Sequence, residues 1–349
     1  MYLRGGVLRS IAIRIAALAG AAGVCALAAG CPGSRQTAAV TVDPTEVDSE
    51  DPAVPREELT RDLEATVMEN YSHLTLGNFG AFRDGLSPEM PVTLIGVTPE
   101  DVVAGRRPAA AGRDRRLYRA LGPTLLTKNL EIQLSEDGSV GWLFDEMSYR
   151  VPYGGRTASI PIRNTSLFVR DFDRWVLVME HLSYAVSIDG IRGLAASGRL
   201  VTPAELPSRY QIAPARELLR LVTSLHNAGP TRALAAIRAA PGTLVLLPDR
   251  DHEMRGASAA HAPSLATLFG PGTTVVLRDY RLGIAKNQKV AWMAANLAVR
   301  TVINDEKVDL GLRGTYVFEL GPGGWKVVQM HLSVAVPERD LGRHIFGTQ

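Results

Sequence analysis

His181 and Glu146 are the side chains in this sequence with the most potential for acid–base chemistry. Both lie in long runs rich in β-branched and aromatic residues, which predicts strands. Alternation along a strand places Glu146 on one face with Trp142, and His181 on one face with Trp175. If those faces coincide, the carboxylate can orient the imidazole as a general base that removes a proton next to a carbonyl.

The elements that must position these residues follow a fixed order of periodicities. Apolar residues fall at i, i+3, i+4 and i+7 on one face of a helix that opens at Pro214; they are Leu218, Leu221, Val222 and Leu225. An equivalent helix follows Pro55, and a shorter helical stretch comes after each. Long strand-like runs with turn signals then follow. Helices followed by a meander of strands predict an α+β fold.

This order occurs twice, because the chain repeats itself at a shift of 150 positions. The shift pairs Trp142 with Trp292, Trp175 with Trp325, and His181–Ser183 with His331–Ser333. A duplicated module explains this pattern.

The duplication also tests the catalytic hypothesis. His331 is kept in the second copy, but the residue equivalent to Glu146 is Asn296. A catalytic pair of His181 and Glu146 can therefore exist only in the first module. The alternative is an architectural role, in which the imidazole and the serine hydroxyl satisfy backbone groups at the end of the sheet.

Three stretches carry a resemblance to a known family: Ile95–Gly105, Gly141–Trp142 and Arg174–Ser183. With them, the module resembles the SnoaL-like branch of the nuclear transport factor 2-like superfamily, over nearly all of residues 55–340. The resemblance implies a cone in which helices pack on a curved antiparallel sheet and leave a pocket at the open end. Members include dehydratases, isomerases and cyclases, and also many binding or assembly modules. The family commonly dimerises through its sheet, so the two copies can pack as an internal pseudo-dimer.

The amino-terminal residues predict export and lipidation. Arg4, Arg9 and Arg14 precede an apolar, alanine-rich run, which is typical of a secretory signal peptide. The residues before Cys31 resemble a bacterial lipobox, so we expect the acylated cysteine to anchor the protein to the membrane. Pro32 stands where an aspartate marks inner-membrane retention, which favours the outer membrane as the location in the cell envelope.

The domain organisation follows from these signals. We expect a signal peptide (1–30), a disordered tether after the lipidated cysteine (31–54), a first SnoaL-like domain (55–190), a linker (191–213), a second SnoaL-like domain (214–342) and a carboxy-terminal tail (343–349).

Composition and charge exclude several functions. The hydrophobic share of 46% and charged share of 21% suit globular domains rather than disorder. Without residues 1–30 the chain has 35 basic and 36 acidic residues, so its net charge of −1 gives no support for nucleic-acid binding. Cofactor-binding motifs are absent from the sequence, and the Asp249–Glu253 string has no metal-ligand spacing.

The sequence thus favours a non-catalytic envelope protein that binds a small molecule or another envelope protein. The alternative is an isomerase- or dehydratase-type enzyme that uses His181 and Glu146 in the first module. Candidate ligand-binding residues are Trp142, Tyr149, Trp175, His331 and Trp292.

The predicted anchor can be tested by metabolic labelling with palmitate. We expect the wild-type protein to incorporate label and Cys31→Ser to lose it, because the thiol is the acylation site. Replacement of Cys25 by serine is the matched control, since this residue leaves with the signal peptide. Label that persists in Cys31→Ser would contradict the anchor.

Overall fold

The computed structural model describes residues 54–105, 124–153, 156–196, 214–303 and 305–337. The predicted signal peptide, Cys31, most of the predicted linker and the predicted tail lie outside the described residues. In the part of the chain that is described, no helix combines the length and apolar character needed to cross a bilayer.

Among its described residues, the first module has two helices followed by a six-stranded sheet. In chain order its elements are α1 (Arg56–Thr75), α2 (Phe79–Asp84), β1 (Val92–Ile95), β2 (Val102–Gly105), β3 (Thr124–Leu134), β4 (Val140–Tyr153), β5 (Arg156–Asp171) and β6 (Arg174–Ser183). Helix α5 (Ile188–Ala196) follows and buries Ile191 and Leu194. It begins within the range predicted for the first domain (55–190) and runs into the range predicted for the linker (191–213); the sequence had not indicated a helix here.

The second module repeats this order, and the first-module counterparts of its η1 and α8 (106–123) lie outside the described residues. Its elements are α6 (Ala215–Asn227), α7 (Pro230–Ala236), β7 (Leu244–Leu246), β8 (Glu253–Arg255), the 3₁₀ turn η1 (Ala259–His261), α8 (Ala262–Phe269), β9 (Thr274–Ile284), β10 (Val290–Ile303), β11 (Glu306–Gly321) and β12 (Gly324–Val334). The predicted α+β fold with two tandem modules is confirmed.

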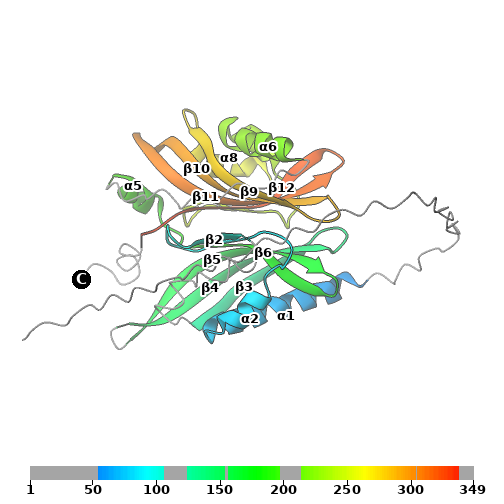
Figure 1. The fold of residues 1–349 in the computed structure, drawn as a ribbon. Coiled ribbons are helices and arrows are strands. Elements are labelled where there is room, and N and C mark those ends of the chain that lie inside the picture. Colours follow the sequence, from blue (N-terminus) through cyan, green and yellow to red (C-terminus); the bar gives the residue numbers. More distant parts are fainter. Residues whose placement is uncertain (1–53, 106–123, 154–155, 197–213, 304, 338–349) are drawn as a thin grey trace, which may run out of the picture. The chain divides into compact units, whose positions relative to one another are not determined.

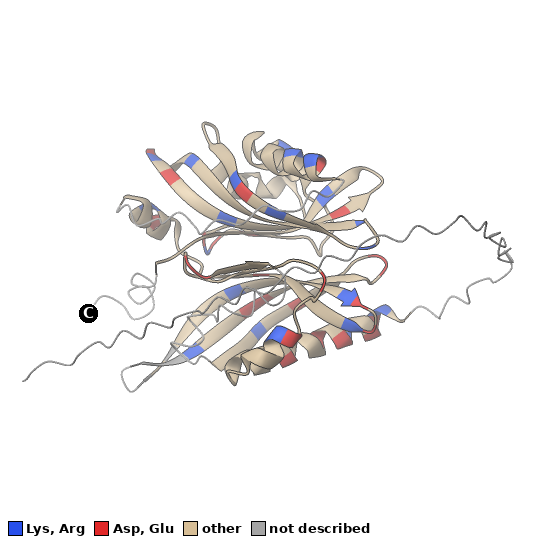
Figure 2. Cartoon of the chain, in the orientation of Figure 1, with Lys and Arg blue, Asp and Glu red and all other residues tan. Residues whose placement is uncertain are grey.

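Helix α1 shows why the modules have a helical side. Its buried residues Leu59, Leu63 and Val67 recur every four positions and form one apolar face. Its other face is acidic (Figure 2). Glu57 and Glu58 lie in the first turn, where carboxylates interact favourably with the helix dipole. The apolar face packs on the sheet and leaves the charges in solvent.

The two sheets have the same topology. The strand orders are β2-β1-β6-β5-β4-β3 and β8-β7-β12-β11-β10-β9. In each sheet the first short strand of the module pairs in parallel with the last strand, and the other neighbours are antiparallel. The short strands β2 and β8 were not predicted, because three or four residues are too few for alternation to indicate a strand.

A bulge at the same position in both modules reverses the side-chain alternation of the last strand. Leu167 pairs with Met179 while Phe168 pairs with Leu177, so Val178 has no partner. The register shift in β12 leaves Val328 unpaired in the same way. An extra residue moves every later side chain to the opposite face. Trp175 and Leu177 before the bulge therefore lie in the core under the helices, whereas Met179, the next odd-numbered residue after it, lies in the cluster between the modules.

Each sheet has one face toward its own helices and one toward the other module (Figure 1). Leu63 on α1 and Trp175 on β6 belong to the core under the helices. A separate apolar cluster joins the two sheets; it contains Val140, Trp142, Leu167, Val178 and Met179 from the first module, and Val290, Trp292, Ala294, Val317 and Val328 from the second. The sheet face of each module is thus covered by the other module.

We expect Leu63→Ala to lower the free energy of unfolding by about 2–5 kcal/mol, because Leu63 is fully buried and its loss leaves a cavity. Leu76→Ala is the matched control, since 76% of Leu76 is exposed. Urea unfolding of both variants measures the difference. Equal stability of the two variants would contradict the packing described for α1.

Candidate functional site

His181 and His331 lie against each other where the two sheets meet. Their ring centroids are 3.9 Å apart and the ring planes differ by 22°. Both residues are fully buried. They occupy equivalent positions in β6 and β12, after the bulges at Val178 and Val328, so both rings point toward the other module. The duplicated histidine forms the centre of the contact between the modules.

Each imidazole is hydrogen-bonded on both nitrogens by hydroxyls of the other module. Nε2 of His181 lies 2.7 Å from Ser333 Oγ, and Nδ1 lies 3.2 Å from Thr315 Oγ1. The partners of His331 repeat this arrangement. They are Ser183 at 2.7 Å and Thr165 at 2.9 Å. The histidines and serines of the repeated His-Leu-Ser run therefore form hydrogen bonds with side chains of the other module. The expected hydrogen bonds to backbone groups at the end of the sheet are not the contacts that they make.

The electrostatic surroundings keep both imidazoles neutral. Burial and the nearby guanidinium groups of Arg313 and Arg163 lower the pKa of His181 well below its usual value. Burial lowers the pKa of His331 in the same way, with further contributions from His181 and both arginines. A neutral imidazole has one N–H donor and one acceptor nitrogen, which two hydroxyls can satisfy. The pair is suited to holding the modules together and is a poor base.

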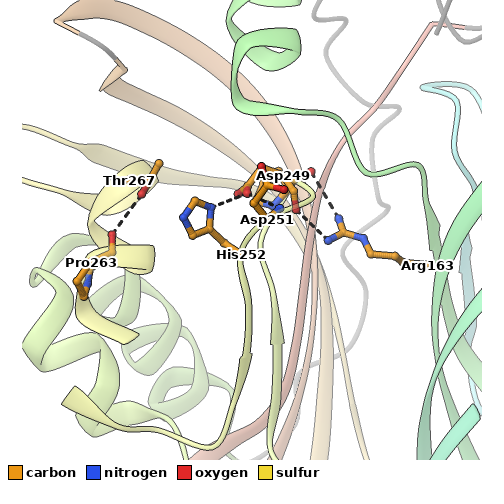
Figure 3. Close-up of polar contacts among 7 residues, drawn as sticks. Arg163, Asp249, Asp251, His252, Pro263 and Thr267 are labelled. Carbon is orange, nitrogen blue, oxygen red and sulfur yellow. Dashed lines mark hydrogen bonds and ion pairs between the residues drawn. The ribbon is translucent and has the colours of Figure 1, made fainter. Parts of the chain in front are cut away.

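Two buried arginines flank the histidine pair and reach into the opposite module. Arg163 donates to the carbonyl oxygens of Asp249 (3.1 Å) and Pro248 (3.5 Å), as Figure 3 shows. Its repeat equivalent Arg313 donates to Thr98 and Val97, both at 2.9 Å. Burial lowers the pKa of each guanidinium to about 10, so both remain charged at neutral pH. Each arginine fixes the loop between two short strands of the other module.

The loop held by Arg163 contains a histidine–aspartate contact. Nδ1 of His252 lies 2.5 Å from Oδ1 of the fully buried Asp249, which also accepts the backbone N–H of Asp251 at 3.0 Å (Figure 3). These are the residues whose types could have suited a metal ion. Within the described ranges, no group of three His, Cys, Asp or Glu side chains is arranged to hold one. The contact stabilises the loop conformation that presents its carbonyls to Arg163.

Glu146 and His181 are not brought together. Glu146 is exposed and pairs in the β4–β5 ladder with Arg163, whereas His181 pairs with Thr165, two positions further along β5. Both ring nitrogens of His181 are already bonded to hydroxyls of the second module. The Glu146 charge acts on Arg163 instead, where it favours the charged guanidinium.

The aromatic candidates are divided between two cores. Trp142 and Trp292 belong to the cluster between the modules, and His331 lies beside that cluster. Tyr149 and Trp175 belong to the core under the helices. Simple alternation placed Trp175 on the same face as His181, but the bulge at Val178 separates them. The five residues therefore do not line one pocket.

A polar network inside the first module was not predicted from the sequence. Ser166 donates to the Asn164 side chain (3.1 Å), which donates to the Tyr71 hydroxyl (2.9 Å). The carboxylate of Asp145 is fully buried on the same side; burial raises its pKa, and the nearby Tyr71 hydroxyl opposes that rise. Glu180 is also buried on this side of the sheet. The sequence did contain a signal for this network, because Asp145 and Glu180 are acidic residues within the largely apolar strands β4 and β6.

A small cavity lies beside this network. It is bounded by Asn70, Tyr71, Ser166 and Glu180 among apolar residues and has a volume of about 10 Å³. One water molecule needs roughly that much room. Among the described residues, which leave out 106–123, side chains fill the space next to the network.

The second module replaces the network with an uncharged pair. The repeat equivalents of Asp145, Asn164 and Glu180 are Ala295, Gly314 and Met330. Nε2 of His226 on α6 lies 2.7 Å from the Tyr316 hydroxyl. Burial lowers the pKa of His226 to about 3 and raises that of Tyr316. Gly314 provides the space, since a Cβ there would lie 2.8 Å from the Tyr316 hydroxyl.

Comparison with known proteins assigns the family. The sequence matches the SnoaL-like domain over residues 63–187 and again over residues 225–337. The chain belongs to this family and contains two tandem copies of its domain. Among curated proteins, none matches the sequence.

The solved structures that match parts of this chain are distant in sequence. An NTF2-like protein with a cystatin-like fold from Novosphingobium aromaticivorans is 15% identical, with a TM-score of 0.32; the match covers 40% of this chain and 89% of that one. A nuclear transport factor 2-like superfamily protein from Salmonella enterica serovar Typhimurium is 19% identical, with a TM-score of 0.31; the match covers 35% of this chain and 92% of that one.

The histidine pair predicts that stability falls as the pH drops below about 6.5, the pKa of histidine in an unfolded chain. The folded protein keeps both rings neutral, so the unfolded state binds more protons below that pH. Each histidine should therefore remove about 1.4 kcal/mol of unfolding free energy per pH unit.

Urea unfolding between about pH 7 and pH 5.5 measures this dependence. The dependence of the unfolding free energy on pH should be weaker in the variant His181→Gln than in the wild type. It should be weaker still in the double variant that also carries His331→Gln. His226 is unchanged in both variants and still contributes to the dependence. An unchanged slope in the double variant would contradict neutral burial of the pair.

Proposed function

We propose that this chain is a non-catalytic, lipid-anchored binding protein of the bacterial cell envelope. In this proposal Cys31 holds it on the outer membrane, the tether up to residue 54 separates the modules from the bilayer, and the paired modules bind a small molecule. The observation that carries the proposal is that His181 is fully buried, with both ring nitrogens bonded to the second module.

The small cavity beside Tyr71 and Glu180 supports the same conclusion. Sites for small molecules usually have volumes of about 300–1,000 Å³. The volume of this cavity, about 10 Å³, is far below that range. A substrate in the cone would have to displace Tyr71 or other core residues, at the cost of their packing.

One observation favours the enzyme alternative. The first module keeps Asp145 and Glu180 buried on the interior face of its sheet, whereas the second has Ala295 and Met330 there. Burial raises the pKa of Asp145, as in general bases and acids of enzymes. An isomerase or dehydratase would then use these interior carboxylates, together with an opening of the cone.

The two functions can be separated by examining molecules that co-purify with the detergent-solubilised protein. We expect native mass spectrometry to detect a bound small molecule, and incubation in deuterium oxide to leave the mass of its carbon skeleton unchanged, because no proton is removed from carbon. The Asp145→Asn variant, which removes one ionisable group from the interior, should retain the molecule equally well.

Two outcomes would contradict the binding proposal. One is the absence of any bound molecule, both in native spectra and in extracts of the denatured protein. The other is incorporation of deuterium by the wild type that is lost in Asp145→Asn, which would establish the enzyme alternative.

A further inference from the structure

A cleft opens between the two modules beside the apolar cluster that joins their sheets. Its volume is about 420 Å³, within the range of small-molecule sites. The first module contributes Arg56, Gln133, Leu134, Glu136 and Trp142, and the second contributes Arg238, Ala240, Gly242, Thr243, Glu319 and Val328. Neither module could form this cleft alone.

One wall of the cleft is apolar. Leu134, Trp142 and Val328 are all buried apolar residues that line it. Trp142 is 5% exposed, so a small part of its ring faces the cleft. An apolar part of a ligand can pack against this wall and be removed from water there.

The polar groups of the cleft carry both signs of charge. The Arg56 guanidinium donates to the carbonyl oxygens of Leu134 (2.6 Å) and Ser135 (2.9 Å), so it is held in place. Arg238 forms an ion pair with Glu319. Glu136 is exposed. Two guanidinium groups and two carboxylates around one apolar wall suit a molecule that itself carries one charge of each sign.

The repeat shows that this cleft is a departure from the symmetry of the two modules. Where the first module has Gln133, the second has Gly283. The Trp292 ring lies so close over Gly283 that a Cβ there would be 2.2 Å from its Cε2 atom. Trp142 cannot take the same position over Gln133, because the glutamine has a Cβ. The Gln133 amide lies instead against Gly242 of the second module.

We propose that this cleft is the binding site for a small zwitterion with an apolar side chain, of the class of amino acids and dipeptides. The ligand carboxylate lies toward Arg56 and Arg238, its ammonium group toward Glu136 and Glu319, and its side chain against Trp142, Leu134 and Val328. This inference rests on the proposed binding function and names its site and ligand class.

Calorimetric titration with the dipeptide Ala-Phe tests the site. We expect binding by the wild type, and at least about tenfold weaker binding of N-acetyl-Phe and of Phe-amide, each of which lacks one charge. Arg238→Ala and Ala240→Leu should weaken Ala-Phe by a similar factor, the first by loss of charge and the second by filling the cleft.

The matched control is Arg300→Ala, which removes an exposed ion pair with Asp309 outside the cleft. It should bind Ala-Phe within about twofold of the wild type. Thermal unfolding of all three variants verifies that they fold. Failure of the wild type to bind Ala-Phe, or equal binding by folded Ala240→Leu, would overturn the site.

The same variants separate this inference from the proposed function. One outcome is that the variant Ala240→Leu retains a co-purifying molecule as well as the wild type does. That result would agree with the binding function but would show that the cleft is not the binding site. If the wild type contains no co-purifying molecule and does not bind Ala-Phe, both proposals are wrong.

Discussion

Mutual burial of His181 and His331 is the interaction on which the arrangement of the two modules depends. Removing two imidazoles from water is costly unless every ring nitrogen finds a partner. The serine and threonine hydroxyls supply those partners only when the two sheets face each other in one register. Arg163 and Arg313 impose a similar constraint, since each guanidinium needs the loop carbonyls of the other module.

These polar requirements explain how a largely apolar contact acquires a unique geometry. The cluster around Trp142 and Trp292 supplies the surface removed from water, but apolar contacts tolerate small displacements. Buried hydrogen bonds do not, because a slipped register would leave the histidines and arginines without partners. The walls of the cleft beside Trp142 come from both modules, so the same hydrogen bonds fix the geometry of the cleft.

Duplication allowed the two modules to become different. The first keeps a polar interior with Asp145 and Glu180, and the second has an uncharged His226–Tyr316 pair. The difference between Gln133 and its equivalent Gly283 likewise affects only one side of the contact. A symmetric homodimer could not alter one site without altering the other. Fusion into one chain removes that limit.

The sequence by itself determined the α+β class, the presence of two copies and the order of helices and long strands. These properties are predictable because hydrophobic periodicity and internal repetition are local in the chain. The repeated His-Leu-Ser run also identified the residues that matter most at the contact, although not what they do.

Only the tertiary structure decided which way those residues point and what they meet. The bulge at Val178 moved His181 and Trp175 to opposite faces, and strict alternation could not anticipate an unpaired residue. The hydroxyl partners of His181 are more than 130 residues away in the sequence. Such contacts depend on how two separately folded sheets pack, and no local pattern encodes that packing.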